Sequence, residues 1–205
     1  LPNSSCPTNT TCSAASAWTP ILRQQIKMAN QKDLFINASL QCGIVTDTTV
    51  KSLSVDDSVD SALARATIRV RVKITGPNGV SYAQPSAGVD ATNTPDVTTT
   101  PPAGVVFCDR IQELKAKFAG LNCTANLTTG EVICANPEEL ELILKTLNAN
   151  AFNFVAPNLV SGEHTIDVEA RTSANVSTTG TNGSLGSANA FIGAGPYWVD
   201  RDSNQ

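Results

Sequence analysis

Ala151 to Thr172 reads A-F-N-F-V-A-P-N-L-V-S-G-E-H-T-I-D-V-E-A-R-T, and this segment carries the clearest strand signals of the chain. An apolar run is interrupted at Pro157, and Gly162 supplies a turn position before a second alternating run. In that second run one face holds His164, Ile166, Val168 and Ala170, and the other holds Thr165, Asp167, Glu169 and Arg171. The alternation predicts a hairpin-like strand-turn-strand unit whose second strand has one dry side and one wet side.

The same segment contains a Leu-x-x-Gly-x-His-Thr-x-x-Val pattern that runs from Leu159 to Val168. In this pattern it resembles the late strands of immunoglobulin-like and related β-sandwiches. The resemblance covers about a tenth of the chain and implies a fold class. It implies no activity, because one fold can serve many functions.

Length and charge restrict the remaining possibilities. The chain has 205 residues and a formal net charge of −4, and its Lys and Arg residues do not cluster. An electrostatic nucleic-acid binder needs a basic stripe, so no nucleic-acid partner is expected. No apolar run approaches the roughly 18 residues of a membrane span. We predict one domain at residues 18–199, between a polar tail at 1–17 and a second tail at 200–205.

Two further segments have the alternation of half-buried strands. Residues 33–45 place Leu34, Ile36, Ala38, Leu40 and Cys42 on one face, and residues 66–75 do the same with Ile68, Val70, Val72 and Ile74. The first parity puts Asn37 outside, with Ile36 and Ala38 buried. The second puts Arg69, Arg71 and Lys73 outside, where we expect them to face Asp167 and Glu169 on a neighbouring strand. The alternative is an anion-binding or polysaccharide-binding ridge.

A single helix is predicted near the middle of the chain. Asn136 is a candidate N-cap and Pro137 fits the first helical position. Leu140, Ile143, Leu144 and Leu147 follow at helical spacing. Residues 105–118 are expected to form a bulged strand and residues 173–187 a polar loop. The sequence therefore predicts a mainly β protein, an immunoglobulin-like or jelly-roll β-sandwich with one short helix and long polar loops.

The cysteines indicate disulfides rather than a zinc site, because no C-x-x-C pair occurs and the chain has one histidine. They are Cys6, Cys12, Cys42, Cys108, Cys123 and Cys134. Several pairings are possible for six cysteines. The pattern favours a local Cys6–Cys12 loop, a local Cys123–Cys134 bridge and a Cys42–Cys108 bridge through the core.

The sequence is rich in N-glycosylation sequons of the form Asn-x-Ser/Thr. They lie at Asn3, Asn9, Asn37, Asn122, Asn126, Asn175 and Asn182. The chain also begins at Leu1 without a Met, which suggests a removed targeting peptide. Together these features predict a secreted, extracellular or cell-surface glycoprotein.

Catalytic and cofactor signals are weak. His164 is the one candidate base, and its inward position predicts a core residue. Asp56, Asp57 and Asp60 lack the spacing of a calcium loop, so no metal or cofactor is predicted. Trp18, Tyr82, Tyr197 and Trp198 are the aromatic side chains available for stacking on a sugar, and we take Trp18, Tyr197 and Trp198 as candidate ligand-binding residues.

These observations predict a structural or adhesive surface protein that is not an enzyme. Its expected partners are further copies of itself and glycans, with filaments built by laying the tail at residues 1–17 along a neighbouring sandwich. One alternative is a carbohydrate-binding, lectin-like module. The other is a glycoside hydrolase, which would have to use carboxylate pairs such as Glu138 with Glu139 or Asp167 with Glu169.

Overall fold

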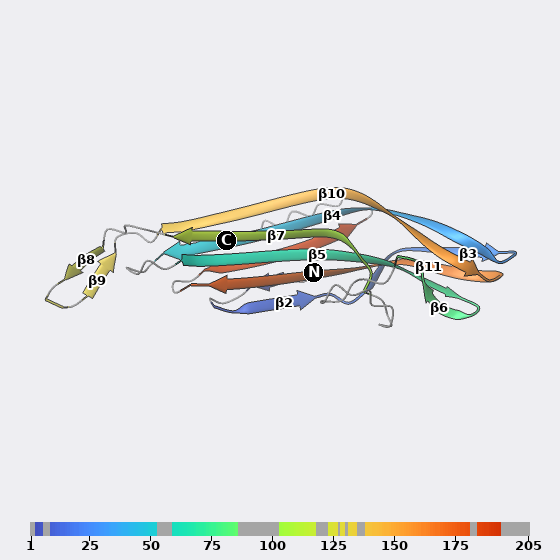
Figure 1. Ribbon diagram of the computed structural model, residues 1–205, viewed down its shortest axis with the longest axis horizontal. Coiled ribbons are helices and arrows are strands. Elements are labelled where there is room, and N and C mark those ends of the chain that lie inside the picture. The colour runs from blue at the N-terminus through green and yellow to red at the C-terminus, as the bar shows by residue number, and fades with distance from the viewer. Residues whose placement is uncertain are drawn as a thin grey trace.

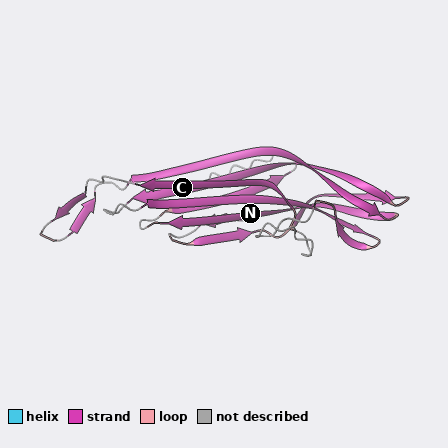
Figure 2. Ribbon diagram, in the orientation of Figure 1, coloured by secondary structure: helices cyan, strands magenta, loops and turns pink. Residues whose placement is uncertain are grey.

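The structure is a computed structural model, and it describes residues 3–5, 9–52, 59–85, 103–117, 123–126, 128–129, 131–134, 138–180 and 184–193. Every regular element in these residues is a β-strand (Figure 2). The strands are β1 (Asn3–Ser5), β2 (Thr11–Ala15), β3 (Thr19–Met28), β4 (Lys32–Ser52), β5 (Val59–Gly76), β6 (Gly79–Tyr82), β7 (Val105–Lys117), β8 (Cys123–Asn126), β9 (Glu131–Cys134), β10 (Glu138–Leu159), β11 (Gly162–Thr179) and β12 (Leu185–Gly193).

Ten of these strands form two antiparallel sheets that pack face to face as an elongated sandwich (Figure 1). Sheet A has the order β1-β12-β4-β10, and sheet B has β11 and β5 at its centre. β2 and β3 pair with successive parts of one side of β11, and β7 and β6 do the same on β5. β8 and β9 form a separate hairpin that projects beyond one end of the sandwich in Figure 1.

The chain crosses between the sheets at most of its turns. The segment from Ala151 to Thr172 does form strand, turn and strand, as predicted. Its two strands are not a hairpin, however, because β10 pairs with β4 in sheet A and β11 pairs with β3 and β5 in sheet B. Val160 and Ser161 therefore carry the chain from one sheet to the other.

The core lies between the facing sides of the two sheets. The predicted inward residues of residues 66–75 are all buried, and so are Ala38, Leu40 and Cys42 of residues 33–45. Leu34 and Ile36 are half-buried near one end, and Asn37 is exposed as predicted. The strand periodicity of both segments is therefore confirmed, because alternate side chains point to opposite faces of a sheet.

The predicted helix is wrong. Residues from Glu138 onward belong to β10, which pairs with β4 without a register shift as far as Ala156. The apolar residues that suggested a helix divide between the two faces of the strand, with Leu140 and Leu144 on the inner face and Ile143 and Leu147 on the outer face. Because β10 pairs with β4 along its whole length, the backbone N–H and C=O groups of every second residue of the segment find hydrogen-bond partners in β4. Tertiary pairing thus overrides the local helix signal.

Three smaller expectations also change. β11 continues to Thr179, so the predicted loop at 173–187 begins later, because Ala174, Val176 and Thr178 face the interior. The bulge in β7 lies at Phe107, between the residues paired with Ile68 and Arg69, earlier than predicted. Residues 3–5 and 11–15, expected in a separate tail, are strands of sheets A and B of the same chain.

Candidate functional site

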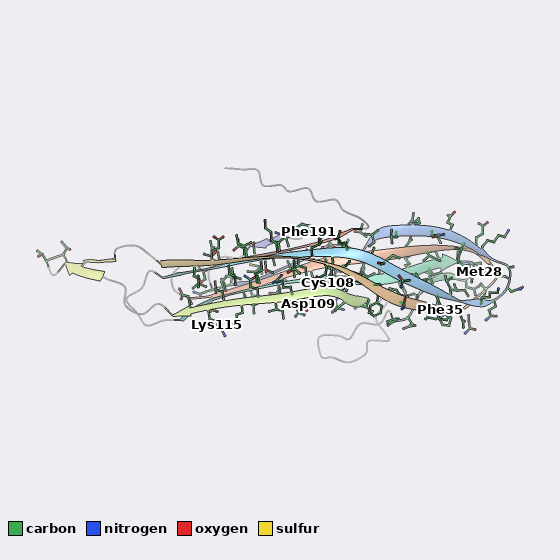
Figure 3. All side chains as sticks on the ribbon, turned by 90° about the horizontal axis from the view of Figure 1, so that it is seen from above. Met28, Phe35, Cys108, Asp109, Lys115 and Phe191 are labelled. Carbon is green, nitrogen blue, oxygen red and sulfur yellow. A yellow bond between two sulfur atoms is a disulfide. The ribbon has the colours of Figure 1, made fainter. Side chains whose placement is uncertain are left out.

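Polar and charged side chains of the described residues cluster in three places. One is an ion-pair cluster on the outer face of sheet B, the second is a groove beside a disulfide, and the third is a cleft beside His164. Figure 3 places Cys108 and Asp109, which line the groove, near the middle of the molecule's length.

The ion-pair cluster is built by the register of β5 and β11. This register sets Arg71 opposite Glu169 and Lys73 opposite Asp167. The Nε of Arg71 donates to Oε2 of Glu169 at 2.6 Å, and both residues are buried. The expected cation-carboxylate pairing across neighbouring strands is therefore confirmed for Arg71 and Glu169.

β3 supplies the second ion pair from the other side of β11. Arg23 lies opposite Asp167 and donates through Nε to Oδ1 at 2.6 Å and through a terminal nitrogen to Oδ2 at 3.2 Å. The hydrogen bond and the charge of Asp167 raise the pKa of the Arg23 guanidinium above its ordinary value. Such a two-point contact fixes the orientation of the carboxylate.

Two aromatic rings enclose the buried arginine. The guanidinium carbon of Arg71 lies 4.2 Å from the centre of the Trp18 ring and 5.0 Å from that of Tyr82. Both distances are within the range of a cation-π contact. The Trp18 ring also lies close to Gly104, where a Cβ atom would come within 2.7 Å of it.

This cluster corrects two predictions. The face of β11 predicted to be wet is only partly so, because Asp167 and Glu169 are buried while Arg171 is exposed. Arg71 lies on the outer face, as predicted, but it is buried there beneath the two rings. Trp18, predicted to stack on a sugar, stacks on Arg71 instead. Tyr197 and Trp198, the other candidate ligand-binding residues, lie outside the described residues.

The groove of about 570 Å³ lies between β7 and β10 and is lined in part by the Cys42–Cys108 disulfide. This disulfide joins β4 of sheet A to β7 of sheet B, with 6.7 Å between the two Cα atoms, and confirms the predicted core bridge. Asn150 donates to the Phe107 carbonyl oxygen at 3.1 Å. The walls carry Asp109, which pairs with Arg65, and Arg110, and the other lining groups are amide, hydroxyl, disulfide and apolar, so the groove presents contacts for binding.

The cleft beside His164 has a volume of about 440 Å³ and lies near the end of the sandwich where β3, β5 and β11 meet. His164 is buried, as predicted, and its Nε2 donates to the Val160 carbonyl oxygen at 2.8 Å. Its Nδ1 is buried without a hydrogen-bond partner. Gly76 lies beside the ring, and a Cβ atom there would collide with Nδ1. The imidazole thus fits a space that only glycine leaves open.

Two aspartates outside the cluster have shifted pKa values. Burial alone would raise the pKa of Asp109, but hydrogen bonds from Arg65 and Thr67 and the charge of Arg65 lower it below 3.8. Burial, followed by the charge of Glu141, raises the pKa of Asp47 above 3.8. One carboxylate is therefore stabilised in its charged form and the other is destabilised.

The predicted modification sites divide by location. The sequon side chains of Asn9, Asn37 and Asn175 are exposed. Asn3 lies on β1 and Asn126 on β8, whereas Asn122 and Asn182 lie outside the described residues. Cys12 is disulfide-bonded, and Cys6 is outside the described residues. β8 and β9 set Cys123 directly opposite Cys134.

In the described part of the chain, no three His, Cys, Asp or Glu side chains are placed to hold a metal ion. No helix there is long and apolar enough to cross a membrane. Glu138 and Glu139, one of the carboxylate pairs considered for hydrolysis, follow each other along β10. In the other pair, Asp167 forms an ion pair with Arg23 and Glu169 forms one with Arg71.

No family model matches the chain, and no curated protein matches it. Among solved structures, a chain titled "Structure of infectious bursal disease virus Gx strain" aligns with 93% of this chain at 11% sequence identity and a TM-score of 0.10. The present chain spans 39% of the length of that chain. A similarity this low carries no argument about fold or function.

Proposed function

We propose that this protein is a secreted, N-glycosylated and disulfide-bonded structural or adhesive surface protein, and that its sandwich is a jelly roll. The observation that carries the proposal combines the exposed sequons with the buried disulfide. Asn37 lies on the outer face of sheet A and Asn175 on the outer face of sheet B, while Cys42–Cys108 joins the sheets inside. Glycans need solvent and disulfides need an oxidising compartment, so both features fit the secretory route.

The strand order supports a jelly roll. If β2 and β3 are taken as one interrupted edge strand and β6 as an edge hairpin, eight strands remain in two sheets of four. Among these eight, only β5 and β7 are consecutive along the chain and paired in one sheet. An immunoglobulin-like sandwich joins several consecutive strands within a sheet, whereas a jelly roll repeatedly crosses between sheets.

The charged groups favour a structural role over a hydrolase. Glu169 and Asp167 are each held by an arginine, and Asp109 is held by Arg65. A glycoside hydrolase needs two carboxyl groups across a cleft that holds the sugar. Jelly rolls occur both in assembling shells and in lectins, which is an analogy at the level of the fold. The lectin-like alternative now depends on Tyr197 and Trp198, since Trp18 stacks on Arg71.

The test is to express the chain through a eukaryotic secretory pathway. Intact mass before and after enzymatic deglycosylation should show several N-glycans, and Asn37→Gln should remove one of them. Light scattering over a range of concentrations should show assemblies larger than the monomer. A monomer that binds a glycan array saturably, and loses that binding on Trp198→Ala, would instead identify the lectin-like module. An unglycosylated secreted product would contradict the proposal.

A further inference from the structure

Among the described residues β10 is the edge strand of sheet A, and most of one of its long sides has no backbone partner there. In the described residues β4 pairs with one side of β10 from Glu138 to Leu159. On the other side Gln84 is the only backbone partner in the part of the chain that the structure describes, and it exchanges two hydrogen bonds of 2.7 Å with Val155. An open edge presents a row of backbone donors and acceptors to any strand that can lie against it.

The Gln84 contact shows which backbone groups point outward. N–H and C=O groups alternate in direction along an antiparallel strand. Val155 points toward Gln84, and β10 keeps one register with β4 from Glu138 to Ala156. The odd-numbered residues of β10 therefore direct their backbone groups to the open edge. In agreement, the carbonyl oxygen of Leu142 faces β4, where Thr48 donates to it at 3.5 Å.

The open part of β10 also exposes apolar side chains on both faces. Leu140 is 46% exposed and Leu142 38% exposed on the inner face, and Ile143 is 49% and Leu147 42% exposed on the outer face. Edge strands usually avoid this combination, because it invites pairing with another chain. The exposure therefore marks the segment as a surface that a further strand would cover.

The charges of this segment are arranged symmetrically. Glu141 lies two residues before Ile143 and Lys145 two residues after it, and all three side chains share the outer face. A strand with opposite charges placed equally about its centre is complementary to an antiparallel copy of itself. Each copy then sets its acid against the other copy's base.

We propose that β10 pairs with β10 of a second copy of this chain, antiparallel, about a two-fold axis at Ile143. The two Ile143 residues then lie opposite each other and exchange both backbone hydrogen bonds. Glu141 faces the partner's Lys145, and Leu142 faces the partner's Leu144. The four strands of sheet A would continue into the four strands of the partner's sheet as a closed two-fold dimer.

Other positions of the axis are less favourable. Odd residues must face odd residues for the backbone groups to bond. An axis at Leu142 or at Leu144 also meets this condition, but it sets Glu141 against the partner's Ile143 or Leu147. An axis at Glu141 or at Lys145 places two like charges opposite each other, which is destabilising. An axis at Leu147 sets Glu141 against the partner's Asn153 and leaves Lys145 facing an alanine. Only the axis at Ile143 opposes Glu141 and Lys145, and it does so twice.

This interface deepens the proposed structural role and rests on it, because it names the surface through which copies associate. It also replaces the route predicted through residues 1–17, whose described strands pair with their own sheets. The two proposals remain separable by experiment. A protein that associates with unchanged affinity after β10 is altered would keep the structural role and lose this interface.

The test uses sedimentation velocity of the full chain to measure the dimer dissociation constant. Ile143→Pro removes an N–H that points to the open edge, so the β10–β4 ladder stays intact. The matched control is Ala151→Pro, which removes an outward N–H of the same strand beyond the proposed contact. We expect Ile143→Pro to weaken dimerisation at least about 100-fold and Ala151→Pro to change it less than about threefold, with both variants folded by circular dichroism.

A charge exchange tests the register. Glu141→Lys sets a lysine against the partner's Lys145, and Lys145→Glu sets a glutamate against the partner's Glu141. Each single change should weaken the dimer about tenfold or more, and the combined change should restore it to within about threefold. A monomer at all concentrations, or a dimer unaffected by Ile143→Pro and by both charge changes, would overturn the proposal.

Discussion

Arg71 and Glu169 form an ion pair in which only 5% and 8% of the two side chains are exposed, with 2.6 Å between Nε and Oε2. The pair bridges the two central strands of sheet B, and the Trp18 and Tyr82 rings lie over the guanidinium. Removing two charges from water is costly, and the attraction between them offsets that cost only while both are present. The two residues therefore depend on each other.

The first prediction is that Arg71→Met destabilises the fold by about 3 to 5 kcal/mol, because Glu169 would remain charged, buried and without its arginine. The double variant Arg71→Met with Glu169→Met should be more stable than either single variant. Urea denaturation of all three proteins gives the free energies of unfolding.

Arg65→Met is the matched control for Arg71→Met. Arg65 lies on the same strand and pairs with Asp109, but nearly half of its side chain is exposed. Its replacement should cost about 1 kcal/mol or less. If the losses in free energy of unfolding caused by Arg71→Met and by Glu169→Met simply added in the double variant, the predicted mutual dependence would be contradicted.

The second prediction concerns the disulfide between the sheets. Cys42 and Cys108 are separated by 66 residues, so their bond closes a long loop of the unfolded chain. Replacing both by alanine should lower the free energy of unfolding by about 4 kcal/mol in the chain-entropy account. Denaturation under non-reducing conditions measures this loss. A non-reducing peptide map that joins either cysteine elsewhere would show that the bridge does not form.

Arg71 shows both what could be predicted from the sequence and what could not. Strand parity and a guess at neighbouring strands were sufficient to predict its pairing with Glu169. Parity alone could not predict that the pair is buried, because Trp18 reaches it from an irregular segment far away in the sequence and Tyr82 from another strand. A period-two pattern tells the two faces of a sheet apart, but it does not say what covers each face.

The β10 segment shows a different limit. Its leucines and isoleucine fit a helical spacing better than a strict alternation, because they lie on both faces of the strand, and a helix start precedes them in the sequence. The choice depends on β4, which lies about a hundred residues earlier and pairs along the whole segment. The turn at Val160 and Ser161 has the same ambiguity, because a hairpin and a crossing between sheets use similar turn residues. Long-range pairing settles both cases.

The third prediction uses two aspartates with opposite pKa shifts. The pKa of Asp47 is raised above 3.8, first by burial and then by Glu141, so ionising Asp47 costs stability. That cost is fully present above the folded-state pKa and disappears as the pH falls below about 3.8. Directly across from Asp47 lie Ile143 of β10 and Ser187 of β12, and Lys145, which is opposite Val45, is a diagonal neighbour. Asp47→Asn should therefore raise the melting temperature by about 1 to 3 °C at pH 7.

Asp109→Asn provides the control with the opposite sign. The folded pKa of Asp109 lies below 3.8, so its carboxylate stabilises the fold above 3.8, and the contribution is lost as the pH falls through the folded value. Asp109→Asn should lower the melting temperature at pH 7. Thermal melts from pH 7 to pH 3 should bring both variants closer to the parent protein. A constant difference across this range would rule out the electrostatic explanation for either residue.

The last prediction concerns Gly104, which supports the Trp18 ring over Arg71. Gly104 has a φ of +71°, and a Cβ atom there would lie 2.7 Å from both the Trp18 ring and the Val70 carbonyl oxygen. Its own carbonyl oxygen accepts a hydrogen bond from Arg69 at 3.2 Å. Gly104→Ala thus adds a collision to an unfavourable backbone angle, and we expect it to cost about 2 kcal/mol or more.

Gly79→Ala is the matched control, because Gly79 has a φ of +98° but open space around it, and should cost only about 1 kcal/mol. Tryptophan fluorescence of the native protein separates the two effects, since displacing Trp18 from Arg71 should change its emission in Gly104→Ala and leave it unchanged in Gly79→Ala. Equal losses of stability with unchanged emission would mean that Gly104 is required for its backbone angle alone.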